Sequence, residues 1–305
     1  MKLPPALVGM LVGLFLSSCS TAQGPPPAGT RMSPSAVAAR ATAAPTATLS
    51  PSPSAAPTAV GAQAIQPPTS WIDAGFIAGQ LTSVETAIRA PETDGFEYPL
   101  LGRNQQQMYH LLAAHRELVP SVLALLQPGV RDPVQANLTA AQQIDSLNGT
   151  QSRLPHWRII APPAPTTLLG YYREAERTFG IRWQYLAAIN LIETNMGRIQ
   201  GLSSAGAQGP MQFMPATWAS YGRGDVNNPH DAIMAAGRYL QAAGAQRDMG
   251  RAIYAYNNSA LYVRAVTLYA QQMFANERAY LGYYNWQVFV PTNSGDVMLP
   301  EGFVN

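Results

Sequence analysis

Glu193-Thr-Asn-Met-Gly-Arg198 and Ser203-Ser-Ala-Gly-Ala-Gln-Gly-Pro-Met-Gln-Phe-Met-Pro-Ala-Thr-Trp218 are the two runs that decide the fold and hold the candidate site. The first run ends a predicted helix, residues 183–194, in which Leu186, Ile189, Asn190 and Glu193 follow the i, i+3, i+4, i+7 spacing of one face. Glu193 is therefore expected on or beside the buried face. A carboxyl in apolar surroundings has a raised pKa and can act as a general acid near neutral pH. On position alone, a solvated helix-terminal Glu is the competing interpretation.

The segment after Glu193 is rich in glycine, which permits positive φ and close backbone approach. These glycines are Gly197, Gly201, Gly206 and Gly209. Pro210 can open a short helical turn that carries the following Met-Gln-Phe. The pattern predicts a crevice beside a single carboxylate.

These runs, together with Ala255-Tyr256-Asn257, resemble the lysozyme-like lytic transglycosylases that cleave bacterial peptidoglycan. The pattern of that family is a Glu, then about a dozen residues to Gly-Ala-x-Gly-hydrophobe-Met-Gln, and later a Tyr-Asn. Gly206 follows Glu193 by 13 residues, which fits. The form Pro210-Met-Gln-Phe-Met-Pro215 is most similar to the membrane-bound B-type branch, and the resemblance covers about residues 167 to 275.

The resemblance implies a role for each matching residue. Glu193 matches the sole catalytic acid/base, and Tyr256 matches a Tyr whose hydroxyl lies near that Glu. The other implied substrate-binding residues are Ser203, near the reacting sugar, Met211, Gln212 and Phe213, which line the glycan groove, and Asn257, which supports the Tyr256 turn. Met211 and Phe213 can equally be core residues, and Ser203 can be a turn cap. Thr194 and Pro210 depart from the Ser and Leu that are common in the family.

The number of acidic residues bears on the reaction. A glycoside hydrolase normally needs two carboxyls across the bond that it breaks. Between residues 167 and 290 only Glu193 has a convincing position, which favours a lytic transglycosylase that cleaves the β-1,4 bond between N-acetylmuramic acid (MurNAc) and N-acetylglucosamine (GlcNAc). The expected product is a 1,6-anhydro-MurNAc end. A muramidase that uses Asp225 as its second carboxyl, and a non-catalytic peptidoglycan-binding lipoprotein, remain alternatives.

No metal or cofactor is expected. The segment Asp225-Val-Asn-Asn-Pro-His-Asp231 is too short for a calcium loop with its closing Glu at position 12. Cys19 is the only cysteine, so no intramolecular disulfide can form. The net charge of +2 gives no reason to expect a nucleic-acid partner. Peptidoglycan is the expected partner, and protein partners are not predicted.

The N-terminus has the features of a bacterial lipoprotein signal. Residues 7–16 are an apolar run that is too short to span a membrane as a helix. Leu16-Ser-Ser-Cys19 closes it and resembles a lipobox, which implies cleavage before Cys19 and lipidation of its thiol. An ordinary signal peptide is the alternative. The expected location is extracytoplasmic, with a lipid anchor holding the chain to a membrane.

The predicted organisation has four parts. Residues 1–18 are the signal peptide, 19–68 a lipidated Cys and a disordered Pro/Ala/Thr/Ser linker, 69–150 a helical accessory region, and 151–305 a lysozyme-like helical catalytic domain with a short aromatic C-terminal segment. The fold class is mostly α. Helices are expected near residues 71–89, 105–126 with a kink or split at Pro120, 132–147, 167–178, 183–194, 232–242, 248–256 and 261–274. Thr167 and Asp231 are expected to cap the starts of two of these helices, and Gly180 is expected to end the helix at 167–178. Residues 283–290 are aromatic and expected to be strand-like.

Overall fold

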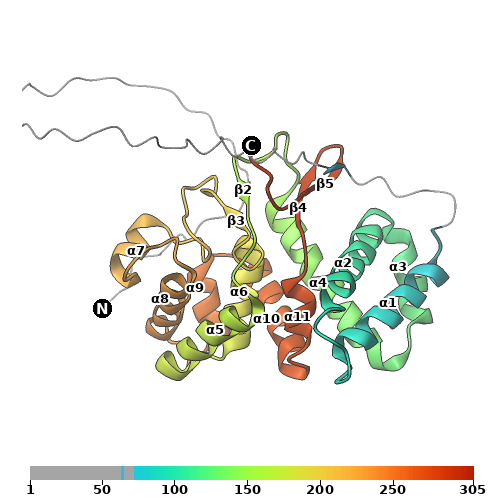
Figure 1. Ribbon diagram of the computed structural model, residues 1–305, viewed down its shortest axis with the longest axis horizontal. Coiled ribbons are helices and arrows are strands. Elements are labelled where there is room, and N and C mark those ends of the chain that lie inside the picture. The colour runs from blue at the N-terminus through green and yellow to red at the C-terminus, as the bar shows by residue number, and fades with distance from the viewer. Residues whose placement is uncertain (1–62, 65–71) are drawn as a thin grey trace, which may run out of the picture. The chain divides into compact units, whose positions relative to one another are not determined.

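The structure is a computed structural model that describes residues 63–64 and 72–305 (Figure 1). The predicted signal peptide, Cys19 and all of the linker except residues 63 and 64 lie outside the described residues. Eleven α-helices account for most of the described residues, and the strands are short. The prediction of a mostly α fold is therefore confirmed.

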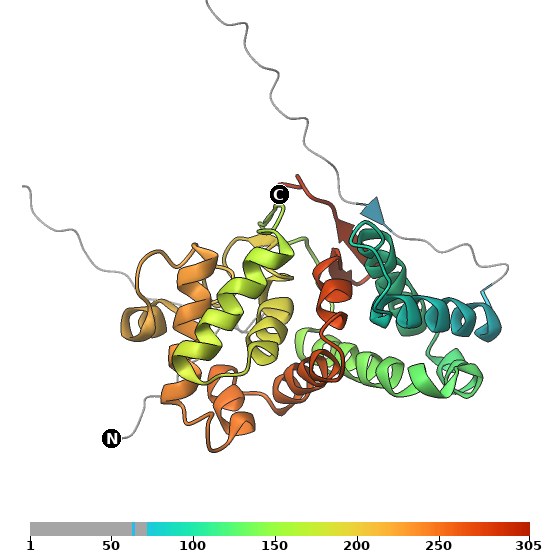
Figure 2. The ribbon, with the colours of Figure 1, turned by 60° about the horizontal axis from the view of Figure 1, so that its bottom comes forward.

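The first helices form a layer at one end of the molecule (Figures 1 and 2). They are α1 (Ala74–Arg89), α2 (Tyr98–Ala114), α3 (Val119–Leu125) and α4 (Pro128–Asn148), with a 3-10 turn at Arg116–Leu118. Asp73 caps α1, because its Oδ1 accepts the backbone N–H of Phe76 at 2.7 Å. The helix predicted at 105–126 is divided, but the break lies at His115 and the 3-10 turn, and Pro120 stands in the first turn of α3.

Two predicted helix starts in this layer are wrong, since α2 begins at Tyr98 rather than near residue 105 and α4 begins before residue 132. Pro133 lies inside α4, which begins at Pro128. The missing N–H of Pro133 removes one hydrogen bond near the start of a 21-residue helix. The burial of Val130, Val134 and Leu138 along one face offsets that loss.

The second group of helices carries the candidate site. They are α5 (Pro165–Phe179), α6 (Trp183–Thr194), α7 (Pro215–Tyr221), α8 (Pro229–Ala242), α9 (Met249–Tyr256), α10 (Ala260–Ala275) and α11 (Ala279–Tyr284). Gly180 ends α5 with φ of 70°, as predicted. Thr167 and Asp231 are not the caps that were predicted. Each helix starts earlier, at a Pro in its first turn, and the side chain of Asn228 accepts the N–H groups of His230 and Asp231.

Five strands form two small sheets. The first has the order β1-β5-β4, from β1 (Gln63–Ala64), β4 (Val288–Thr292) and β5 (Gly295–Leu299), and all pairs are antiparallel. The second pairs β2 (Arg158–Ile159) with β3 (Ile199–Gln200), directly after the predicted catalytic helix. The aromatic segment predicted as strand-like at 283–290 is the end of α11 followed by β4.

Helix α10 joins the two groups of helices. It packs against α4 on one side and α6 on the other, and one hydrophobic core runs through all three. The described residues, 63–64 and 72–305, belong to one compact unit by their contacts. Helices α1 to α4 therefore share a core with the region that holds Glu193.

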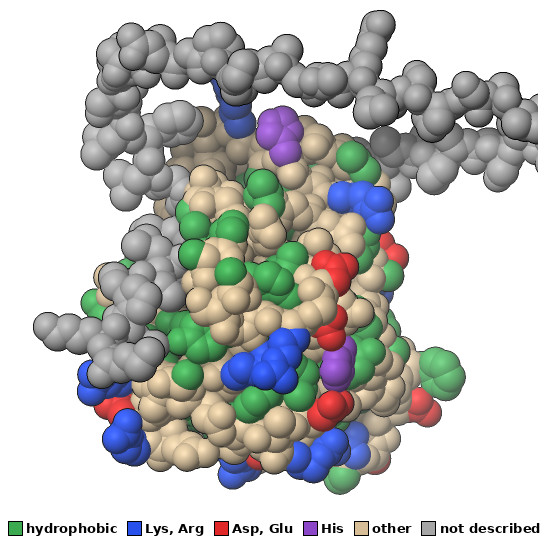
Figure 3. All heavy atoms as spheres, turned by 90° about the vertical axis from the view of Figure 1, so that its left-hand side faces the viewer, with side chains coloured by type: hydrophobic (Ala, Val, Ile, Leu, Met, Phe, Trp, Pro, Cys, Tyr) green, Lys and Arg blue, Asp and Glu red, His purple; other side chains and the backbone are tan. Residues whose placement is uncertain are grey.

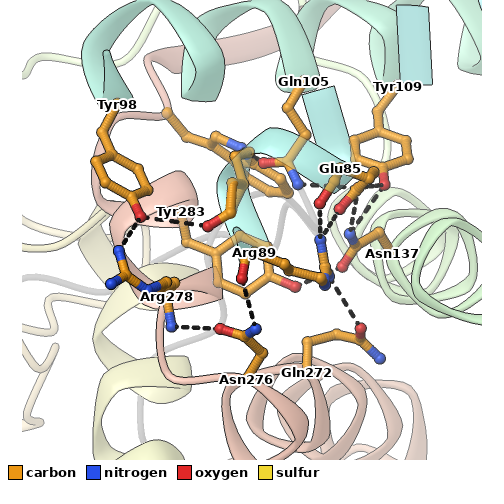
Figure 4. A network of polar contacts seen from close by, with 12 residues as sticks. Glu85, Arg89, Tyr98, Gln105, Tyr109, Asn137, Gln272, Asn276, Arg278 and Tyr283 are labelled. Atoms are coloured by element: carbon orange, nitrogen blue, oxygen red, sulfur yellow. Dashed lines mark hydrogen bonds and ion pairs between the residues drawn. The ribbon is translucent and has the colours of Figure 1, made fainter. Parts of the chain in front are cut away.

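A buried polar network reinforces this joint (Figure 4). Glu85 of α1 is fully buried, forms an ion pair with Arg89, and accepts a hydrogen bond from the hydroxyl of Tyr109. Gln105 and Asn137 donate to its Oε1 at 2.9 and 3.2 Å. The other partners cross to α10 and α11: Arg89 donates to Gln272 at 3.2 Å, and Tyr283 donates to Asn137 at 2.6 Å. We call these residues the Glu85 network.

Helix length and hydropathy also bear on membrane insertion. Across residues 63–64 and 72–305, no helix combines the length and the apolar character that a membrane crossing requires.

Candidate active site

Helix α6 brings the candidate carboxyl into the interior of the protein. Ten of its 12 residues are buried, as expected for a helix that is apolar on nearly every side. The helix ends at Asn195 and Met196, whose φ angles of 50° and 63° turn the chain sharply away. Glu193 is the penultimate helical residue, so its side chain stays in the core while the chain after it forms a loop.

Glu193 is only 2% exposed, and one side chain of the described residues forms a hydrogen bond with it. The hydroxyl of Tyr262, in the first turns of α10, donates to its Oε1 at 2.6 Å. Burial raises the pKa of Glu193 to about 8, and the hydrogen bond from Tyr262 opposes that rise in part. Burial and the nearby carboxyl also raise the pKa of Tyr262 well above its usual value, so Tyr262 remains a donor. Glu193 thus holds a proton at neutral pH.

Two side chains of α6 fix the loop that follows. Asn190 and Thr194 both donate to the carbonyl of Pro210, at 2.7 and 2.6 Å. The Thr194 hydroxyl also accepts the N–H of Gly197 at 3.1 Å. Thr194, a departure from the common Ser, therefore supplies the hydroxyl that ties the loop to the helix.

The loop itself needs unusual backbone geometry. Gly209 has φ of 72°, and a Cβ there would meet the carbonyl oxygen of Val226 at 1.9 Å, so only glycine fits. Gln212 has φ of 48°, which is uncommon for a residue with a side chain. Phe213, the next residue, forms an isolated antiparallel β-bridge with Gln208. Backbone outliers of this kind often occur at functional sites. The helical turn predicted from Pro210 is absent here.

A cavity lies beside this loop. Its volume is about 270 Å³. Its walls are Ile160 to Pro163, Gly197, Ile199 to Gly201, Gly209, Pro210, Asn227 and Pro229. Of the four glycines predicted to permit a crevice, Gly197, Gly201 and Gly209 line this cavity, and Gly206 and Glu193 do not.

Two predicted substrate contacts take core positions instead. Met211 and Phe213 are both 0% exposed. The ring of Phe213 packs against Trp218 and Tyr256, with centroids 5.6 and 5.9 Å apart. The expectation that these side chains line a groove is corrected: only their backbone can face a glycan, as the competing core interpretation held.

Tyr256 lies near Glu193 as expected, because the carboxyl of Glu193 contributes to the raised pKa of Tyr256, but the hydrogen bond to Glu193 comes from another Tyr. The Tyr256 hydroxyl donates to the carbonyl of Met211 at 2.7 Å and thereby holds the loop that contains Met211. Tyr262, six residues later, donates the hydrogen bond to Glu193. No local pattern in the sequence marked Tyr262, because its contact with Glu193 depends on the packing of α10 against α6.

The remaining predicted residues stabilise turns. Ser203 Oγ accepts the N–H of Ala207 at 2.9 Å, which is the turn-cap role. Gln212 is 3% exposed and donates to the carbonyl of Gly209 at 2.9 Å. Asn257 is buried, and its carbonyl accepts the N–H of Ser259 at 2.6 Å. Sugar contacts from these three residues stay predictions.

No second carboxyl acts on Glu193. Within the described residues, no acidic group is among the causes that shift its pKa. Asp225 is exposed and accepts the N–H of Asn227 at 2.9 Å. The other acids of this region have partners elsewhere: Glu174 and Asp231 with His230, Glu176 with Arg182, Glu277 with Arg173, and Asp248 at the start of α9.

Other kinds of site find little support in the described part of the chain. It contains no group of three or more His, Cys, Asp or Glu residues that could hold a metal ion. Figure 3 shows one face of the molecule, on which acidic and basic side chains are interspersed with apolar ones. That face has no continuous basic patch of the kind that nucleic acids require.

Comparison with known families identifies the region around Glu193. Residues 170–277 match the model of the transglycosylase SLT domain. No curated protein and no solved structure matches the chain. The matched range contains Glu193, the loop after it, Tyr256 and Tyr262, and its helical fold is lysozyme-like. At the level of the family, the match supports lytic transglycosylase activity on peptidoglycan.

Proposed function

We propose that this protein is a peptidoglycan lytic transglycosylase with Glu193 as its single acid/base. The observation that carries the proposal is a buried carboxyl with a pKa of about 8, one neutral donor and no second acid acting on it. The proposed bond is the β-1,4 link between MurNAc and GlcNAc. The proposed product is a 1,6-anhydro-MurNAc end.

The chemistry needs only one carboxyl. Protonated Glu193 donates to the glycosidic oxygen as the bond to the MurNAc anomeric carbon breaks. The substrate's own N-acetyl group stabilises the developing positive charge. Glu193, now a carboxylate, accepts the proton of the MurNAc C6 hydroxyl, whose oxygen bonds to the anomeric carbon. Glu193 ends as it began, and no water or cofactor is consumed.

Tyr262 has a positioning role in this scheme. Its hydroxyl holds one oxygen of Glu193, which leaves the other oxygen for the substrate. The hydrogen bond also stabilises the carboxylate that forms after proton donation. Burial favours the protonated form before the reaction, and Tyr262 limits the cost of the charged form during it.

Mass spectrometry of digested peptidoglycan tests the proposal. Purified cell wall treated with the protein should yield fragments with anhydro-MurNAc ends, which are lighter than reducing ends by one water. Reducing ends that disappear in an Asp225→Asn variant would instead show a muramidase. Intact cell wall after prolonged digestion, together with retained binding, would show a non-catalytic glycan-binding protein.

We also propose that the chain is a lipoprotein, similar to the B-type branch, anchored through Cys19 outside the cytoplasm. Leu16-Ser-Ser-Cys19 supports this, and such an anchor would keep the enzyme near its polymeric substrate. The mass of the mature N-terminal peptide tests it. A diacylglycerol thioether on Cys19, lost in Cys19→Ser, is expected, whereas cleavage elsewhere without lipid would contradict it.

A further inference from the structure

A second cleft lies on the other side of α6 from Glu193. It consists of two adjoining cavities, of about 220 and 410 Å³. Both cavities share the residues His110, Ala113, Asp145, Phe289, Pro291 and Asp296. We call this the hairpin cleft, because β4 and β5 form one of its walls and α2 and α4 form the others.

The hairpin cleft reaches the catalytic helix but not the catalytic carboxyl. Leu191, Ile192 and Asn195 line it, and Glu193 does not. Successive residues of an α-helix point about 100° apart, so these side chains face away from Glu193. The cleft is thus a separate site, about one helix diameter of 10 Å from the reacting group.

The wall of the cleft contains a fixed ring and a paired His. The ring of His110 lies over Phe289 with centroids 3.9 Å apart. His110 Nδ1 contacts Asp296 Oδ2 at 2.6 Å, while both side chains keep partial exposure, 27% and 33%. A side chain held by stacking on one face and a carboxylate on one edge is preorganised for a ligand.

Polar groups without partners lie in the same wall. The side-chain oxygens of Asn148 and Asn195 are buried and lack a hydrogen-bond partner among the described residues. The side chain of Asp145 lines the cleft and has no hydrogen-bond partner among the described residues. Partial desolvation in the cleft and the nearby Asp296 raise the pKa of Asp145, while His110 and Arg116 oppose that rise. This wall of the cleft therefore has several hydrogen-bond acceptors whose donors are not supplied by the described residues.

The charges facing the cleft do not favour a charged ligand. They are His110 from α2, Arg116 from the 3-10 turn, Asp145 from α4 and Asp296 from β5. Positive and negative groups are mixed, so their charges add little binding free energy for either a cationic or an anionic ligand. A neutral ligand with many hydroxyls fits better, because carboxylates, amides and imidazole accept and donate to hydroxyls. Ring faces such as Phe289 can pack against the apolar face of a sugar.

We infer that the hairpin cleft binds a saccharide segment at a second site beside the catalytic helix. The proposed function supplies only the identity of the polymer, a glycan strand whose length exceeds the catalytic site. The residues that form the cleft lie largely outside the 170–277 match, in α2, α4 and the β4–β5 hairpin. The helical layer before residue 150 thereby gains a role in holding the substrate.

The test uses the full chain with Glu193→Gln and the trimer of N-acetylglucosamine as the probe. Indole N–H signals in NMR report each site separately: Trp286 lines the hairpin cleft, and Trp218 packs beside the catalytic loop. Trp157 is not used, because its indole N–H donates to the carbonyl of Leu202 in the loop after Glu193. We expect the trimer to shift the Trp286 signal with a measurable Kd. His110→Ala or Asp145→Ala should weaken that Kd about tenfold, the equivalent of 1.4 kcal/mol, and leave the Trp218 response unchanged.

Matched controls outside the cleft are His115→Ala, at the residue directly after α2, and Asp132→Ala, within α4. They should leave both responses unchanged. The inference would be overturned if the cleft signal did not shift with the trimer, or if its Kd were unchanged in both cleft variants. A signal that shifted only with trilysine, used as a cationic comparison ligand, would also overturn it. Failure of the wild-type protein to release anhydro ends would overturn the proposed function alone, because the titration does not depend on turnover.

Discussion

Two buried glutamates, one in each group of helices, have opposite surroundings. Glu85 is 0% exposed and is surrounded by Arg89 and neutral donors. Glu193 is 2% exposed and has the hydroxyl of Tyr262 as its partner in a largely apolar setting. Figure 4 shows how many groups converge on the first of these carboxylates. Both sites contain a Tyr that donates to the carboxyl, so a Tyr–Glu pair alone does not distinguish them.

The contrast indicates that burial of a carboxyl is not in itself a sign of catalysis. A cation and several donors stabilise a buried carboxylate, and the cluster then acts as a structural joint. A buried carboxyl with a single neutral donor keeps its proton near neutral pH, and that proton is available for transfer. Variants of the two glutamates should therefore fail in different ways.

Glu193→Gln should produce the largest effect. The amide keeps the size of the side chain but has no proton of suitable acidity to transfer. Release of anhydro ends should fall about a thousandfold, within the range of 10² to 10⁴ for a general acid–base group. Circular dichroism should show an intact fold. Activity that persists at more than a few per cent would remove Glu193 from the mechanism.

Glu85→Ala should instead reduce stability. The variant leaves Arg89 buried without its carboxylate, which typically costs about 3–5 kcal/mol. Urea unfolding should show this loss, while the fraction that stays folded keeps its activity. Glu92→Ala, at an exposed position of the same region, should change stability by about 0.5 kcal/mol or less. Full stability with lost turnover in Glu85→Ala would make Glu85 the functional acid and reverse the comparison.

The raised pKa of Glu193 should also make the stability of the protein depend on pH. Folding raises the pKa of Glu193 from 4.5 to about 8. Between pH 4.5 and about 8 the folded protein therefore binds one more proton at Glu193 than the unfolded chain. The contribution of this proton to the free energy of unfolding is complete below pH 4.5 and is lost as pH rises through 8. Glu193→Gln does not titrate, so its stability relative to wild type should increase by about 1.4 kcal/mol per pH unit inside the window. Parallel curves from pH 5 to 8 would show that Glu193 is not buried as described.

Local patterns made part of this site predictable. The spacing of apolar residues gave α6 and the buried position of Glu193, and the glycine pattern gave the loop beside it. Gly180 acts through its own backbone geometry, so its effect could be read from sequence. Helix starts at α4, α5 and α8 were misplaced, because a second possible start lay within a few residues and packing chose between them.

Contacts between distant segments were not predictable in the same way. Tyr262 meets Glu193 only because α10 packs against α6, and no local pattern encodes that crossing. The Glu85 network likewise joins residues that are far apart in sequence, so the region before residue 150 gave no functional signal. Met211 and Phe213 follow the family pattern whether they line a groove or fill the core, and only the fold distinguishes these roles.

The smallest effect that we predict is a change in the pH profile of activity, and it distinguishes Tyr262 from Tyr256. Tyr262→Phe removes the hydrogen bond that lowers the pKa of Glu193, so the pKa should rise further above 8 and the alkaline limb of kcat/KM should move to higher pH. The rate at neutral pH should fall about tenfold, since one hydrogen bond to a charged group contributes about 1.5 kcal/mol or more. Tyr256→Phe instead leaves the buried carbonyl of Met211 without its donor, which costs about 1–3 kcal/mol of stability. Its pH profile should keep the wild-type alkaline limb, and an equal shift in both variants would show that Tyr262 acts through the fold rather than on Glu193.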